Sequence, residues 1–165
     1  MDKVNFAINM QTIKKFVVSS GRPVIAGLTT LVMLIAIQLV VSAQGNTGIN
    51  FVGVGSYAVT GKYIDMKVDK IVNKRAAKSK SGSLRVSVWA TKEAYNGGTI
   101  NGYVLGRYSM EPLQGGFTRS NVAVSVQYAP PPKGTYVIVM TLDEFDSSRQ
   151  WVTADFITFK KLQAF

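Results

Sequence analysis

Alternating apolar and polar residues mark several segments of the chain. The alternation is clear over residues 63–70, 84–89 and 122–128, where every second side chain is apolar. A period of two places the apolar side chains on one face of an extended strand and the polar ones on the other. Strands with one dry and one solvated face are typical of antiparallel sheets. The pattern therefore predicts three half-buried strands.

Other segments predict strands of a different character. Residues 136–142 are almost continuously apolar, as in a central strand that is covered on both faces. Residues 151–159 are rich in aromatic and β-branched side chains and predict the last strand. Two weaker strand predictions are residues 51–54 and residues 102–110, where Gly106 interrupts the pattern.

Turn-forming residues separate these segments. Polar or glycine-rich breaks occur at residues 78–83, 96–98, 114–116 and 146–148, and prolines occupy residues 130–132. No amphipathic helical pattern follows residue 43. We therefore predict an all-β fold, an antiparallel immunoglobulin-like β-sandwich of six to eight strands, with a small barrel as the alternative.

One uncharged apolar run, residues 24–41, stands apart from the alternating segments. As a helix, its 18 residues would extend about 27 Å, close to the roughly 30 Å of a bilayer's apolar core. Four Lys or Arg and one Asp precede the run, so the positive-inside rule places the N-terminus in the cytoplasm and the rest of the chain across the membrane. We predict one N-terminal apolar helix that serves as an export signal or a membrane anchor.

Two interpretations of residues 1–43 compete. Val41 and Ala43 are suitably small for a secretory signal that is cleaved between Ala43 and Gln44. Alternatively, the run is retained as a single-pass anchor, because the charged part ahead of it is long for a signal unless Met10 is the true start. A buried core helix is disfavoured, since the run has no polar face. The predicted domains are residues 1–43 for export, 44–61 for a glycine-rich linker or first strand, and 62–165 for the sandwich.

The chain of 165 residues contains neither Cys nor His. This composition excludes disulfides, Cys or His metal sites, and catalysis by a thiolate or an imidazole. The lack of cysteine and of Asn-X-Ser/Thr acceptors favours a bacterial source. No phosphate loop or dinucleotide fingerprint occurs. We predict a protein that is not an enzyme and that takes no cofactor and no metal ion.

An ordered set of segments resembles a known kind of module. The segments are SGSLRVSVWAT at 81–91, YNGGTINGY at 95–103, LQGGF at 113–117 and YAPPPKGTY at 128–136. Together they resemble an immunoglobulin-like β-sandwich module of bacterial secreted and surface proteins, over roughly residues 62–160. Such modules often accompany a larger enzyme or adhesin, whereas we expect this one to stand alone behind its export segment. The resemblance implies no catalytic residues.

A basic run at residues 70–80 is the first candidate binding element. It contains Lys74, Arg75, Lys78 and Lys80 and no acid, which suits an anionic envelope polymer. The alternative is a charged hairpin loop that keeps an edge strand from pairing with other chains. Nucleic acid is disfavoured as a ligand, because export separates the protein from the genome and no aromatic residue interleaves with these cations.

The aromatic residues Trp89 and Trp151 are the second candidate. In a regular strand Trp89 falls on the opposite face from Val86 and Val88, so it lies either exposed or under a loop. An exposed tryptophan would serve sugars or a partner protein, and burial is the alternative. The acids at 143, 144 and 146 suggest a calcium site or, as we favour, a solvated loop.

These features predict a non-enzymatic, exported β-sandwich module that binds or bridges components of the bacterial envelope or the extracellular space. Its partner would be an envelope or extracellular protein, or an anionic or sugar polymer. The alternative is a membrane-tethered subunit of an envelope complex, held in the inner membrane by residues 24–41 with its N-terminus inside. A hydrolase is a third, disfavoured interpretation. The oligomeric state is left open.

Overall fold

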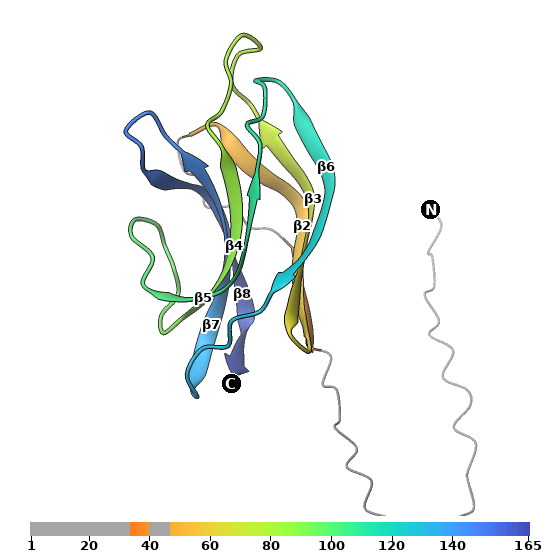
Figure 1. Ribbon diagram of the computed structural model, residues 1–165, viewed down its shortest axis with the longest axis vertical. Helices are drawn as coiled ribbons and strands as arrows, with labels where there is room; N and C mark the ends of the chain where they lie inside the picture. Colours follow the sequence, from red (N-terminus) through yellow and green to blue (C-terminus); the bar gives the residue numbers. More distant parts are fainter. Residues whose placement is uncertain (1–33, 40–46) are drawn as a thin grey trace, which may run out of the picture. The chain divides into compact units, whose positions relative to one another are not determined.

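The computed structural model describes residues 34–39 and 47–165 (Figure 1). Over these residues the chain is all-β, as predicted. The strands are β1 (Leu34–Leu39), β2 (Ile49–Thr60), β3 (Tyr63–Asn73), β4 (Leu84–Thr91), β5 (Gly102–Met110), β6 (Thr118–Gln127), β7 (Thr135–Phe145) and β8 (Trp151–Ala164).

Two antiparallel sheets form a sandwich. Strands β2, β3 and β6 make one sheet in that order, and β1 pairs with the outer edge of β2. The second sheet has the order β5-β4-β7-β8. The two layers face each other in Figure 1, and the prediction of an antiparallel sandwich is confirmed.

The core lies between the inward faces of the two sheets. Ile64, Met66 and Val68 of β3 are buried there, and so are Leu84, Val86 and Val88 of β4. These are the apolar positions of the two alternating segments. Burying one such side chain contributes about 1.5–3 kcal/mol, so this alternation determines which face of each strand points inward.

Strand β2 is longer than the four residues predicted for it because a bulge carries it past Gly53. The register with β3 shifts between Val52 and Gly55, and Gly53 has a φ of 91°. The Asp69 carboxylate accepts a hydrogen bond from the Val54 N–H at 2.8 Å. This N–H would otherwise lack a partner, because the bulge interrupts the backbone pairing of β2 with β3. The glycine that looked like a linker is therefore part of the sheet.

Gly106 does not interrupt β5, contrary to its effect on the sequence pattern. A Cβ at this position would lie 2.4 Å from Cγ2 of Ile64 and 3.0 Å from Cγ2 of Val126. The glycine is therefore placed where strand β5 closely approaches side chains of the facing sheet.

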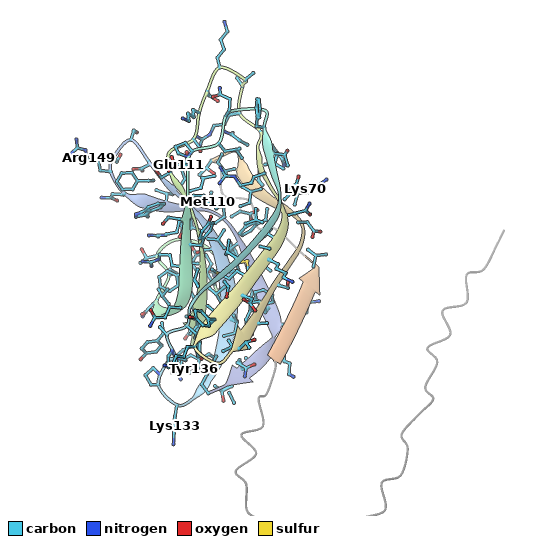
Figure 2. All side chains as sticks on the ribbon, turned by 45° about the vertical axis from the view of Figure 1, so that its right-hand side comes forward. Lys70, Met110, Glu111, Lys133, Tyr136 and Arg149 are labelled. Carbon is cyan, nitrogen blue, oxygen red and sulfur yellow. The ribbon has the colours of Figure 1, made fainter. Side chains whose placement is uncertain are left out.

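The connections gather at the two ends of the sandwich. The basic β3–β4 connection and the β7–β8 hairpin, with Arg149 at its tip, lie towards the top of Figures 1 and 2. The proline-rich β6–β7 connection, with Lys133, lies at the bottom near the C-terminus. The Lys80–Gln114 bridge joins the basic connection to the segment before β6.

The predicted N-terminal helix over residues 24–41 differs from the structure where the two can be compared. Leu34–Leu39 form strand β1, and the remaining residues of the run lie outside the described part of the chain. An uninterrupted apolar run has no periodicity that separates helix from strand, and the open edge of β2 supplies backbone partners for a strand. Within residues 34–39 and 47–165, no helix is long and apolar enough to span a bilayer.

Candidate ligand-binding groove

The outer face of the β5-β4-β7-β8 sheet carries an unusual set of side chains. Arg85, Ser87 and Trp89 alternate along β4 with the core residues and therefore point away from the sandwich interior. Across the ladder, Arg85 pairs with Asp143 and Ser87 pairs with Thr141 of β7. Aromatic, charged and hydroxyl groups thus lie together on one side of the sheet.

A groove of about 520 Å³ opens on this face. Residues 95–100 of the β4–β5 loop form one wall, and residues 151–156 of β8 form the other, with Arg85, Trp89 and Asp143 also lining it. In Figure 1 the β4–β5 loop and the β7–β8 hairpin both project to the left of the sheet. The volume lies within the range of small-molecule sites, about 300–1,000 Å³.

Arg85 is held by two partners in the groove. Its Nε donates to Oδ2 of Asp143 at 2.9 Å, and its guanidinium carbon lies 4.1 Å from the centre of the Trp151 ring. The side chains of Arg85 and Asp143 are only 13% and 5% exposed. The ion pair is therefore less screened than a surface pair, and the cation–π contact fixes Trp151 as well.

A chain of contacts links the two tryptophans. Trp89 Nε1–H donates to Oγ1 of Thr141 at 3.1 Å, and that hydroxyl donates to Asp143 at 3.4 Å. Asp143 also accepts from Oγ1 of Thr153 at 3.0 Å. Through Arg85 the chain reaches Trp151, so both rings are oriented by partners on the protein itself.

The loop wall is anchored by an aromatic contact. The Tyr95 ring stands edge-on to Phe156, with centroids 4.7 Å apart, and the Tyr95 hydroxyl donates to the carbonyl of Gly98 at 2.7 Å. Gly97 and Gly98 have φ values of 112° and 78°, conformations that other residues rarely adopt. The Asn-Gly-Gly sequence thus allows the loop to turn back over β8.

Arg107 of β5 lies beside the groove rather than inside it. Its guanidinium carbon is 5.8 Å from the Trp89 ring centre, and its Nε donates to Oγ of Ser87 at 3.4 Å. Partial burial and then the nearby charge of Arg85 lower the pKa of Arg107, whereas Asp143 raises it. A guanidinium nevertheless stays charged at neutral pH.

The structure brings together Trp89 and Trp151 of the predicted site residues, which are the only two tryptophans of the chain. The sequence interpretation did not single out Arg85, Thr141 or Asp143 as partners of these rings. The alternation that places Trp89 on the outer face applies equally to Arg85, so the sequence does indicate that Arg85 points outward. The sequence does not indicate that Arg85 pairs with Asp143, because the two residues lie 58 positions apart.

The predicted basic residues lie elsewhere. Lys74, Lys78 and Lys80 are exposed in the β3–β4 connection, and none of them lines the groove. Arg75 is engaged by the fold: its Nη1 and Nη2 bond both oxygens of Glu144 at 2.7 and 2.5 Å, and its Nε donates to the Thr47 carbonyl at 2.6 Å. The connection thus presents three lysines to solvent, while Arg75 fastens it to β7.

The acidic cluster at the end of β7 is divided among different partners. Asp143 faces Arg85, Glu144 faces Arg75, and Asp146 accepts from the Gln150 N–H at 3.0 Å in the hairpin turn. Asp143 and Glu144 are strand residues and buried, which corrects the solvated loop that we favoured for them. Over the described residues, no group of three or more acidic side chains is placed to hold a metal ion.

Comparisons with protein-family models, with curated proteins and with solved structures find no match.

Proposed function

We propose that the chain is an exported, non-enzymatic binding module of the bacterial envelope or the extracellular space, and that the groove is its ligand site. The observation that carries the proposal is the contact chain from Trp89 through Thr141, Asp143 and Arg85 to Trp151. Ordering a long side chain on binding costs about 0.5–1.5 kcal/mol, so rings and charges oriented in advance favour association.

We infer that the sandwich is of the immunoglobulin-like kind. Its strand orders, 2-3-6 and 5-4-7-8, correspond to strands A-B-E and C′-C-F-G of that fold. Tyr136, near the start of β7, donates its hydroxyl to the Pro132 carbonyl at 3.1 Å. This contact matches the tyrosine corner at the start of strand F. Both features support the resemblance of the sequence to such modules.

The carboxylates of the groove favour binding over hydrolysis. Asp143 is held by Arg85 and two threonine hydroxyls. Asp155 is fully buried and accepts hydrogen bonds from the backbone N–H groups of Phe51 and Phe156, both at 2.8 Å. Glycoside hydrolysis needs two accessible carboxyl groups, one of which donates a proton. These two aspartates are engaged in orienting the site and in joining the sheets.

Cell fractionation tests the exported location. The full chain, expressed with a C-terminal tag in a Gram-negative host, should yield a soluble exported product whose intact mass and N-terminus correspond to cleavage before Gln44. A full-length product in the membrane fraction would instead support the tethered subunit. A full-length, well-folded product in the cytoplasm would contradict both.

Tryptophan fluorescence tests the groove as the ligand site. Because both tryptophans line the groove, the emission of the protein itself reports on this site. Envelope fractions freed of their own protein should change the emission saturably, and the exposed groove substitution Asn96→Ala should weaken that response. A response that Asn96→Ala leaves unchanged would place the ligand elsewhere.

A further inference from the structure

The composition of the groove also indicates what it binds, if the proposed function holds. We propose that the groove takes an uncharged saccharide segment, which would contact Trp151 and Val152 on one wall and Asn96 and Thr99 on the other. This inference rests on the proposed function, because it names the ligand class of the same site.

The lining combines apolar area, hydrogen-bond donors and hydrogen-bond acceptors, which are the three kinds of surface that a sugar requires. Trp151 and Val152 are 38% and 40% exposed and offer apolar area to the C–H face of a pyranose ring. Asn96 and Thr99 are exposed in the loop wall and supply neutral donors and acceptors. Sugar hydroxyls both donate and accept, so they suit a lining with both kinds of group.

The charges of the site favour an uncharged ligand. Arg85 and Asp143 neutralise each other as an ion pair. Asp155 also borders the groove, but its carboxylate is buried and accepts from the Phe51 N–H of the facing sheet, and Arg107 lies beside the groove near the Trp89 ring. The lining itself therefore carries no excess of positive charge. A site for a phosphate or a polyanion would instead show an excess of positive charge. Three exposed lysines, Lys74, Lys78 and Lys80, lie in the β3–β4 connection, outside the groove.

The size of the groove favours a short oligomer over a protein surface. Its volume of about 520 Å³ is that of a small-molecule site. A stable protein interface buries about 800 Å² on each partner. A saccharide of a few units would fill the groove along the wall that Trp151 and Val152 form.

Fluorescence titration with defined oligosaccharides tests the inference. The probes are cellotetraose, maltotetraose, mannotetraose and the tetramer of N-acetylglucosamine, with trigalacturonate as the charged comparison. At least one neutral probe should produce a saturable change in tryptophan emission, and trigalacturonate should produce none at the same millimolar concentrations.

Matched variants locate the binding. Trp151→Ala should lower the affinity for that probe at least tenfold, which corresponds to about 1.4 kcal/mol. Trp151 also packs on Phe145 and Arg85, so a second variant guards against a folding defect. Asn96→Ala changes an exposed side chain that makes no hydrogen bond within the described residues, and it should lower the affinity at least threefold. Phe117→Ala, which alters an exposed aromatic outside the groove, should leave the affinity unchanged.

The outcomes separate the inference from the proposed function. If trigalacturonate binds and the neutral probes do not, the ligand is anionic and the inference is wrong. If no saccharide binds but an envelope fraction shifts the emission in a manner sensitive to Asn96→Ala, the inference is wrong and the binding module stands. If neither saccharides nor envelope fractions affect the emission, both are overturned.

Discussion

Asp143 and Glu144 are adjacent acids of β7 that have different structural roles. Asp143 points to the outer face and orders the groove through Arg85, whereas Glu144 joins the basic connection to the sheet through Arg75. Glu144 Oε1 also accepts from the Gly82 N–H at 2.9 Å. Because successive side chains of a strand alternate between faces, substitutions at these neighbours should have different consequences.

Glu144→Gln should destabilise the protein. The change removes the charge that Arg75 faces and leaves a half-buried guanidinium without its carboxylate, so we expect a loss of about 1–3 kcal/mol of unfolding free energy. Urea unfolding followed by circular dichroism measures it. Glu111→Gln, at an exposed acid without an ion pair among the described residues, is the control and should change stability by less than about 0.5 kcal/mol. Equal effects of the two changes would contradict the assigned role.

Tyr57 should make stability depend on alkaline pH. Burial, with a smaller contribution from Tyr128, raises the pKa of Tyr57 from 10.0 to about 12. The folded state therefore holds a proton that the unfolded state has released between about pH 10 and pH 12. The stabilising contribution is complete below pH 10 and is lost as the pH rises, with a slope of up to about 1.4 kcal/mol per pH unit. Unfolding midpoints of Tyr57→Phe should decline less steeply over this range, and parallel declines would refute the assignment.

At the scale of the elements, Tyr136 attaches the start of β7 to the proline-rich β6–β7 connection. The Tyr136 ring is buried, its hydroxyl bonds the Pro132 carbonyl, and the Lys92 ammonium lies 3.9 Å from its ring centre. Tyr103 and Phe165 pack edge-on against the same ring, each with centroids 5.9 Å apart. One side chain therefore holds the connection, the β4–β5 loop and the C-terminus together.

Tyr136→Phe should cost about 0.5–1.5 kcal/mol of unfolding free energy, because the ring contacts remain and only the hydroxyl bond is lost. The exposed Tyr63, which makes no hydrogen bond through its hydroxyl in the described residues, provides the control substitution Tyr63→Phe. Chemical denaturation of both variants measures the difference. If Tyr136→Phe is as stable as the control, the hydroxyl does not fix this corner.

The sequence was informative about strands and less so about their partners. Alternation at 63–70 and 84–89 identified the inward faces because a strand's side chains have a strict period of two. It could not predict that Gly53 forms a bulge or that Gly106 meets Ile64, since both depend on which strands face each other. The groove could be predicted only in part for the same reason. Its tryptophans are evident in the sequence, but their linkage through Thr141 and Asp143 depends on the register of the strands.

At the scale of the whole molecule, the edges of the two sheets are not protected equally. Strands β5, β6 and β8 carry Arg107, Arg119 and Lys160–Lys161, and such charges oppose pairing with other chains. Residues 54–60 of β2 contain neither a charge nor a proline. In the structure β1 covers this stretch, with Leu34 opposite Val59 and Leu39 opposite Val54.

Removal of residues 1–43 by export would take β1 away from β2, because Leu34–Leu39 precede the predicted cleavage position. A chain that begins at Gln44 should then self-associate through residues 54–59, as sedimentation velocity over a range of concentrations would reveal. Ser56→Lys, which adds a charge to that edge, should restore the monomer. A monomeric product without Ser56→Lys would contradict this expectation.

The pairing of β1 with β2 also bears on when the protein could assemble. If the chain is exported and cleaved as proposed, β1 would cover the open edge of β2 until cleavage. Assembly through that edge would then begin only after the chain has crossed the membrane.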